Sequence, residues 1–262
     1  YPLLSTMLMT VIPAQVAGVG TITVVCPQPN TQILASAKWL GLTTIVQLGG
    51  AQAIASLAYG TQSIAKVQRI VGPGNSYVAA AKKLVAGDVG IDFVAGPSEI
   101  VIVANAGNPT WIAADMLAQC EHDVEARAIL LTTSTTLATE VQAQVALQLL
   151  TLPTADVASL AVANNSAIIV CQGFEEIIEL VNEIAPEHLA IPDESLPVAS
   201  LVDKIVNAGS IFIGRFSTEA VGDYASGPNH VLPTSGVAAL RGGLSVNDFV
   251  KVITTQSLSE DA

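Results

Sequence analysis

The chain has 262 residues, of which 51% are hydrophobic but only 4% aromatic, a composition typical of alternating strands and helices. Its 22 acidic against 10 basic residues give a formal net charge of −12, which excludes the basic surface that a nucleic-acid partner needs. Three widely spaced cysteines, Cys26, Cys120 and Cys171, favour reduced thiols in a cytoplasmic protein over a disulfide framework. The length allows one large domain or two ordinary ones, and we expect two.

The first charged residue is Lys38, so residues 1–37 resemble a membrane span or a signal peptide. Both are rejected, because the stretch has no basic start and is interrupted by prolines and glycines. We expect a buried helix followed by a buried strand, and no membrane partner. The chain starts at Tyr1 without an initiator Met and stops after Ala262 without a closing element, so it is predicted to be a fragment.

Short strand-like runs alternate with helical windows through the first third of the chain. The predicted strands are 21–27, 43–49 and 67–75, and the predicted helices are 31–41, 51–60 and 76–87. This alternation is typical of parallel βαβ units, and apolar runs bounded by glycine or proline favour a sheet covered on both faces.

A second series of the same style follows. It comprises strands at 90–99, 99–105, 126–133, 166–171 and 210–214 and helices at 109–123, 134–150 and 173–185. The sequence therefore predicts an α/β fold of two Rossmann-like βαβ domains with mainly parallel sheets, covering residues 1–97 and 98–262. From Arg215 onward a stretch rich in Gly, Pro, Ser and Asn predicts functional loops.

The chain has three histidines, His122, His188 and His230, and each has acidic or amide neighbours. Asn108 and Pro109 predict the start of a helix that carries Asp115, Gln119 and His122 on one face. Imidazole nitrogen is a favoured zinc ligand and an amide oxygen an uncommon one, so a metal ligand pair and a solvated helix end both remain open here.

Asp223 and His230 lie in a predicted loop, where Asp223 either completes a metal site or caps a short helix. Glu187 and His188 follow Pro186, at the end of a helix and the start of a strand. A neighbouring carboxylate and imidazole suit base and acid chemistry. Successive strand residues point to opposite sides, however, so both reach one ligand only from an irregular turn.

Two glycine-containing turns are weaker signals. The segment 72–75, GPGN, closes a strand and opens a helix, which exposes backbone N–H groups to phosphate, but a plain turn explains it equally well. In GPSE, 96–99, Ser98 either contacts a ligand or helps to form a turn.

Taken together, the ordered segments resemble those of the histidinol dehydrogenase family over nearly the whole chain. They are GGAQAIASLAYGT, RIVGPGNSYVAAAK, GIDFVAGPSEIVIVAN, DMLAQCEHD, APEHLAI, NAGSIFIG and GDYASGPNHVLPTSG. The resemblance implies a cytoplasmic homodimer that oxidises L-histidinol to L-histidine through the aldehyde, as the last steps of histidine biosynthesis, with two NAD and one zinc ion per subunit.

The resemblance also implies roles for individual residues. Gln119, His122 and Asp223 bind zinc, which holds the substrate, and a further histidine from a C-terminal tail completes the ligand set. His188 acts as base on the alcohol and Glu187 activates the water. The substrate contacts are Ser98, Gln119, His122, His188, Asp223 and His230. The NAD contacts are Gln52 and Asn75.

Three other hypotheses are kept. A zinc hydrolase is suggested by a metal site beside a glutamate, although it needs an open coordination position for water. A non-catalytic binding module would hold ligand without turnover. The family's upstream glycine-rich stretch and its C-terminal tail are absent here, so we also expect the fragment by itself to be catalytically incomplete.

Overall fold

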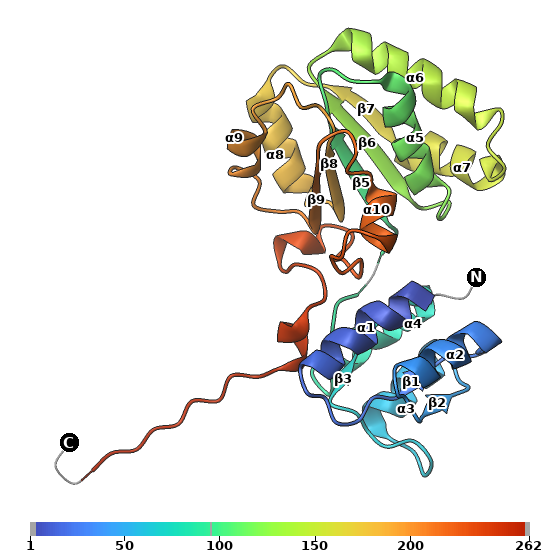
Figure 1. The fold of residues 1–262 in the computed structure, drawn as a ribbon, viewed down its shortest axis with the longest axis vertical. Helices are drawn as coiled ribbons and strands as arrows, with labels where there is room; N and C mark the ends of the chain where they lie inside the picture. The colour runs from blue at the N-terminus through green and yellow to red at the C-terminus, as the bar shows by residue number, and fades with distance from the viewer. Residues whose placement is uncertain (1–3, 95, 260–262) are drawn as a thin grey trace.

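The computed structural model describes residues 4–94 and 96–259, which form two α/β parts connected by a long C-terminal stretch (Figure 1). All strand pairs described are parallel. The prediction of an α/β chain with mainly parallel sheets is therefore confirmed, whereas the domain boundary at residue 97 stays a prediction.

The second part is built on a five-stranded sheet in the order β7-β6-β5-β8-β9. Its strands are β5 (Glu99–Val103), β6 (Arg127–Thr132), β7 (Ala167–Val170), β8 (His188–Ile191) and β9 (Ser210–Ile213). The central strand β5 is buried along its whole length, and after Glu99 its residues IVIV are all apolar because both faces of the sheet are covered.

Successive residues of β5 pack on opposite helix layers. Ile100 and Ile102 lie in one core with α5 (Pro109–Cys120), α6 (Thr135–Leu149) and α7 (Ala155–Asn165). Val101 and Val103 lie in a second core with α8 (Phe174–Ile184) and α9 (Val198–Val202). Helix α7 is not among the predicted elements, because its alanine-rich sequence lacks a clear apolar stripe.

The first part contains two separate pairs of short strands, β1 (Val24–Val25) with β2 (Ile45–Val46) and β3 (Arg69–Ile70) with β4 (Gly90–Ile91). The helices are α1 (Leu4–Val16), α2 (Thr31–Trp39), α3 (Gly50–Tyr59) and α4 (Ser76–Val85). The expected first strand is only half-buried, since a two-residue strand gives little area to pack. Because β4 pairs with β3, residues 90–91 belong to the first series and do not open the second.

Side-chain caps explain where several helices begin. Asn30, Asn75, Asn108 and Ser134 each accept a backbone N–H in the first turn of the following helix. At the other end of α8, Ala185 adopts a left-handed conformation with φ of 48°, and Pro186 follows it. This turn sets the direction in which β8 starts.

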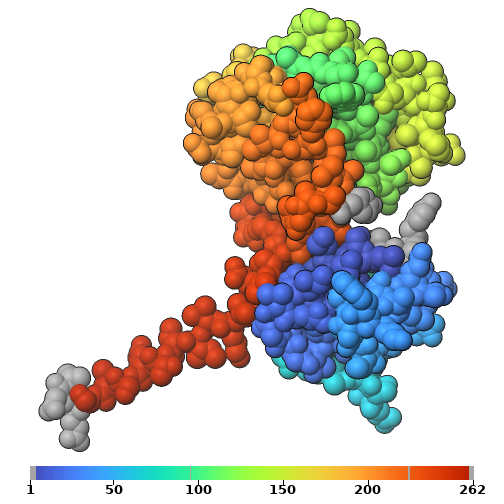
Figure 2. All heavy atoms as spheres, viewed as in Figure 1, coloured from blue at the N-terminus to red at the C-terminus, as the bar shows by residue number. Residues whose placement is uncertain are grey.

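Residues 229–249 return from the second part to the first, where they contain the short 3₁₀ turns η1 (Val237–Ala239) and η2 (Val246–Phe249). Val231 and Leu244 pack with Phe93 and Met9, and the Asn229 side chain donates to the Met9 carbonyl at 2.7 Å. Figure 2 shows this stretch in contact with both parts, before residues 250–259 extend away.

Among the described residues, no helix is long and apolar enough to cross a membrane.

Candidate active site

Glu187 and His188 lie side by side at the amino-terminal start of β8, and both are buried, with 6% and 4% of their surface exposed. The left-handed Ala185 and Pro186 form the irregular turn that the sequence requires if both side chains are to meet. His188 Nδ1 lies 3.8 Å from Glu187 Oε2. Ligands of α/β sheets usually bind at the carboxyl ends of strands, so this position at the amino end is unusual.

The register of the sheet fixes the imidazole of His188. His188 is paired with Ile100 of β5, and its Nδ1 lies 3.2 Å from the Glu99 carbonyl oxygen. Its ring packs against Phe212 of β9, with centroids 5.9 Å apart. A hydrogen bond from Nδ1–H to that carbonyl selects the tautomer in which Nε2 carries the lone pair.

Burial, with smaller contributions from the nearby His122 and His230, lowers the pKa of His188 to about 4. The hydrogen bond to the Glu99 carbonyl acts in the opposite direction but is weaker. The imidazole is therefore neutral at neutral pH and able to accept a proton.

Burial raises the pKa of Glu187 well above its usual range, and the neighbouring carboxyls of Glu219 and Glu99 raise it further. The Glu99 backbone N–H, donated at 3.1 Å to Oε2, and a hydrogen bond with the Ser98 side chain act in the opposite direction. Ser98 thus lies beside the catalytic pair predicted from the sequence.

The predicted zinc ligands come from the end of α5 and from α10 (Glu219–Tyr224). Gln119 is fully buried, yet neither its Oε1 nor its Nε2 has a hydrogen-bond partner within the part of the chain that is described. A buried amide without partners is costly, and a bound ligand would satisfy it.

Two local predictions need correction. The helix that carries Gln119 ends at Cys120, and His122 lies just beyond its C-cap, where the His122 backbone N–H donates to the Gln119 carbonyl at 3.3 Å. Asp223 lies inside the short helix α10 and not in a loop, because the chain after Thr218 forms one helical turn and a half.

The remaining predicted residues join the same cluster. His230 Nδ1 lies 3.1 Å from the Asp223 carbonyl oxygen and 4.0 Å from its carboxylate. His230 and His122 both act to lower the pKa of Asp223, although burial raises it overall. Among the described residues, no group of three His, Cys, Asp or Glu side chains is arranged to hold a metal ion. Gln119, as a glutamine, is not one of these four residue types.

Three acidic residues complete the cluster, and no role for them follows from the sequence. Glu219 is 7% exposed, lies 3.8 Å from His188 Nδ1, and has its pKa raised to about 8 by burial and by the carboxyls of Asp223 and Asp115. Burial raises the pKa of Asp115 to about 6. Glu99 is the first residue of a strand that is otherwise wholly apolar. A charged residue in such a strand is the one sequence signal that could have identified Glu99 as a site residue.

The predicted NAD contacts, Gln52 and Asn75, lie in the other part of the molecule, at the amino ends of α3 and α4. Both are exposed, and the Asn75 side chain caps α4 by accepting the Val78 N–H at 3.1 Å. Among the described contacts, no hydrogen bond joins either residue to the Glu187 and His188 cluster.

A cavity of about 840 Å³ lies at the carboxyl ends of β5 and β8, lined by residues such as Trp111, Asp115, Asp193 and Thr218. None of the predicted site residues lines it. The cluster around Glu187 and His188 and this cavity are therefore different places, although Asp115 lines the cavity and also acts on the charge of Glu219.

Comparison with known proteins gives a consistent result. The sequence model of the family described as histidinol dehydrogenase matches residues 1–262. The chain is similar to histidinol dehydrogenase of Geobacillus kaustophilus, with 52% identity over 269 residues that cover 100% of this chain and 62% of that protein. For histidinol dehydrogenase of Streptococcus mutans the identity is 48%, covering 100% of this chain and 61% of that protein.

Among solved structures, histidinol dehydrogenase from Elizabethkingia anophelis matches with a TM-score of 0.92 and 42% identity, covering 100% of this chain and 61% of that chain. The chain thus spans about three fifths of the length of the relatives that it matches.

Proposed function

The chain belongs to the histidinol dehydrogenase family, and on this premise we propose that the full-length protein oxidises L-histidinol to L-histidine through the aldehyde, with two NAD. The observation that carries the proposal is the buried pair of Glu187 and His188, whose imidazole is neutral at neutral pH. Such a pair supplies the proton transfers that an alcohol and then a hydrated aldehyde require.

In the first oxidation His188 Nε2 accepts the hydroxyl proton of the alcohol while hydride leaves the same carbon, so that a carbonyl forms. The Glu99 carbonyl supports this role because it holds Nδ1–H and keeps Nε2 free. Phe212 packs against the ring and limits its rotation.

In the hydration step Glu187, once ionised, accepts a proton from the water that attacks the aldehyde carbon. Burial opposes that ionisation, and the hydrogen bonds from the Glu99 N–H and with the Ser98 side chain favour it. In the second oxidation the hydrated aldehyde loses a proton and a hydride to give the carboxylic acid.

We propose that Gln119, His122 and Asp223 hold zinc. The observation that supports this proposal is the buried amide of Gln119, which has no partner among the described residues. When bound there, zinc would hold the substrate's imidazole and amine and, as a cation, lower the pKa of nearby carboxyls. His230 lies beside Asp223 and Ser98 lies beside Glu187, and both are proposed to contact the substrate.

NAD, when bound, accepts the hydride, and we propose Gln52 and Asn75 as its contacts. Both follow short parallel strands at helix amino ends, where backbone N–H groups favour phosphate.

For the full-length protein we also propose a cytoplasmic homodimer without a nucleic-acid partner. The free cysteines and the net charge of −12 support the compartment and the exclusion of nucleic acid. The extended segment 250–259 exposes Val252, Ile253 and Leu258, which supports its packing on a second subunit.

The test is to supply histidinol, NAD and zinc to the full-length protein and to follow NADH. We expect NADH with the wild type, and unchanged zinc content with no NADH in His188→Asn. Absence of NADH from the wild type would falsify the proposal. Hydrolytic release of product without NAD would favour the zinc hydrolase, and ligand binding without any turnover would favour the non-catalytic module.

A further inference from the structure

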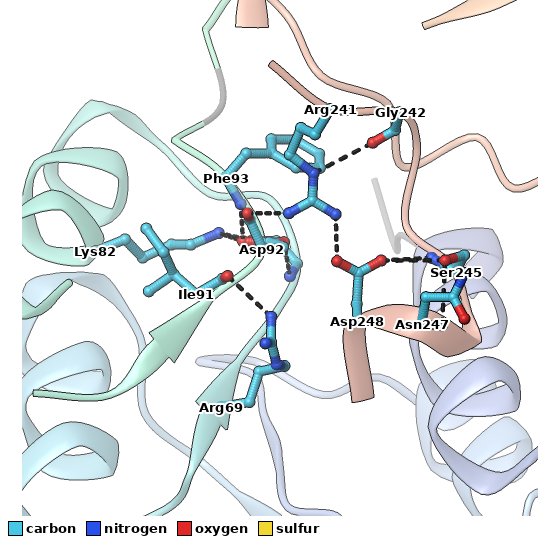
Figure 3. Close-up of polar contacts among 11 residues, drawn as sticks. Arg69, Lys82, Ile91, Asp92, Phe93, Arg241, Gly242, Ser245, Asn247 and Asp248 are labelled. Atoms are coloured by element: carbon cyan, nitrogen blue, oxygen red, sulfur yellow. Dashed lines mark hydrogen bonds and ion pairs between the residues drawn. The ribbon is translucent and has the colours of Figure 1, made fainter. Parts of the chain in front are cut away.

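A buried ion pair lies in the first part of the molecule, between Lys82 of α4 and Asp92 after β4 (Figure 3). Their side chains are only 2% and 1% exposed. Neither residue has a part in the proposed chemistry. Replacing a buried pair by apolar residues often costs no stability, so stability alone is a weak reason for burying two charges.

Both members of the pair hold the same residue, Gly72, which begins the GPGN turn. Asp92 Oδ2 accepts the Gly72 N–H at 2.7 Å, and Lys82 Nζ donates to the Gly72 carbonyl at 3.0 Å. Gly72 has a φ of 110°, a conformation that L side chains rarely adopt. The pair thus fixes the peptide groups on both sides of a residue that has unusual backbone freedom.

The turn leads directly into α4 through Asn75, which caps that helix. The pair therefore determines where the first N–H groups of α4 and the Asn75 side chain lie. Helix α4 is itself tied to the pair, because Lys82 belongs to it.

The pair is also anchored from the far end of the chain. Arg241 donates to the Asp92 carbonyl and pairs with Asp248, and its guanidinium lies 5.4 Å from the centre of the Phe93 ring (Figure 3). Asp92 Oδ1 accepts the Phe93 N–H at 2.7 Å. The Arg241 contacts come from the stretch 229–249, which also contains His230, and together with the Phe93 N–H they leave Asp92 little freedom to move.

We propose that Lys82 and Asp92 are positioning residues for the dinucleotide, which set the conformation of the 72–75 turn before NAD binds. This inference rests on the proposed function, since it assigns the pair to the NAD site of that reaction. The pair touches neither hydride donor nor acceptor and acts through Gly72.

The test uses the full-length protein with the double substitution Lys82→Met and Asp92→Leu, which removes both contacts to Gly72 without leaving an unpaired buried charge. Misplacing a binding group weakens binding strongly, so the equilibrium dissociation constant for NAD, measured by calorimetry without histidinol, is expected to rise about tenfold or more. In steady state the KM for NAD rises in parallel, while the KM for histidinol and the zinc content stay within about twofold.

Asp193→Asn is the matched control. Asp193 is a buried carboxylate, 4% exposed, that accepts the N–H groups of Asn105 and Ala106 at 2.9 and 2.8 Å in the other part of the molecule. It is expected to lower stability without changing NAD affinity. Asp92→Asn is a second variant, which keeps the size of the side chain and one acceptor oxygen. It is expected to give a smaller rise in the dissociation constant for NAD, and it keeps the test usable if the double variant folds poorly.

The outcomes separate the two proposals. A folded double variant that binds NAD as tightly as the wild type overturns the positioning role, as does an equal loss in Asp193→Asn. A wild type that makes no NADH from histidinol overturns the proposed function instead.

Discussion

At the scale of single residues, Gln119 gives a prediction in which the stability of the metal-free protein and its proposed affinity for zinc change in opposite directions. Its amide is buried and unpartnered among the described residues. We expect Gln119→Leu to raise the free energy of unfolding of the metal-free protein by about 1–3 kcal/mol, because the unsatisfied polar group is removed. The same change is expected to weaken zinc binding at least tenfold, roughly the effect of losing a ligand's support.

Gln148→Leu is the control for this substitution. Gln148 donates to the Thr110 carbonyl at 2.9 Å on the surface, so its loss is expected to cost about 1 kcal/mol or less and to leave zinc affinity unchanged. Urea denaturation and zinc titration measure the two effects. A stabilised Gln119→Leu protein with wild-type zinc affinity would remove Gln119 from the ligand set.

Glu219 gives a pH-dependent prediction. Burial raises its pKa to about 8 in the folded protein, against 4.5 for the ordinary carboxyl. Between these values the unfolded chain has released a proton that the folded chain retains, so the buried carboxyl costs progressively more stability as pH rises. We expect Glu219→Gln to stabilise the metal-free protein relative to the wild type, with a difference that grows from pH 4.5 to about 8.

This difference in the free energy of unfolding between Glu219→Gln and the wild type grows by at most about 1.4 kcal/mol per pH unit, because one proton is involved. Urea denaturation at pH 5 and pH 8 measures it. Equal differences between variant and wild type at the two pH values would show that Glu219 is not held protonated by the fold.

At the scale of elements, the approach of β9 to β8 positions Glu187 and His188, the proposed catalytic pair. A Cβ added at Gly209 would lie 2.6 Å from the Glu187 carbonyl oxygen. We expect Gly209→Ala to displace the start of β8, which would lower kcat by about 100-fold and destabilise the protein by roughly 1–3 kcal/mol.

Gly20→Ala is the matched control, because an added Cβ there meets nothing within 4 Å and the backbone is not left-handed. Its effect on stability is expected to stay within about 0.5 kcal/mol. Steady-state kinetics and thermal denaturation compare the two variants. Wild-type kcat in Gly209→Ala would mean that the β8–β9 approach does not set the geometry of the pair.

The longer elements were predictable from sequence because each has its own periodicity and capping signal. Asn108 and Pro109 mark the start of α5, and the run EIVIV marks a strand buried on both faces. The strands of the first part extend over only two residues each, too few for apolar runs to predict their bounds.

The candidate site was predictable only where a motif contains the residue. Gln119, His122, Glu187, His188, Asp223 and His230 were all found in this way. The structure brings the acidic residues and the histidines among them into one cluster, while the roles of all six stay predictions. Glu219 was not predicted, because α10 is too short to show a periodic pattern. The approach of Glu219 to His188 depends on how the chain turns after β9. The Glu99 carbonyl that contacts His188 is a backbone group, which side-chain patterns do not reveal.

At the scale of the whole molecule, residues 229–249 hold the two parts together (Figure 2). Arg241 attaches this stretch to the first part, because it bonds the Asp92 carbonyl, and it also pairs with Asp248 within the stretch. On the other side, the Ser235 N–H donates to Glu99 of the second part at 2.8 Å. We expect the wild type to unfold in a single thermal transition. We expect Arg241→Gln to lower stability by about 1–3 kcal/mol and to show two transitions, because the parts then unfold more independently.

Arg215→Gln is the control, because Arg215 pairs with Glu194 at 3.3 Å on an exposed surface. Such a pair contributes about 1 kcal/mol or less. Calorimetry distinguishes the variants. A single, unshifted transition in Arg241→Gln would show that the apolar contacts of Phe93, Val231 and Leu244 suffice to couple the parts.

The most direct test of the proposed function is the number of NADH molecules formed per histidinol consumed by the zinc-loaded, full-length protein. Two successive oxidations at one site predict a ratio of two, with histidine as the product. A ratio of one, with the aldehyde accumulating, would contradict the role of Glu187 in hydration. A ratio of zero would contradict the proposed function as a whole.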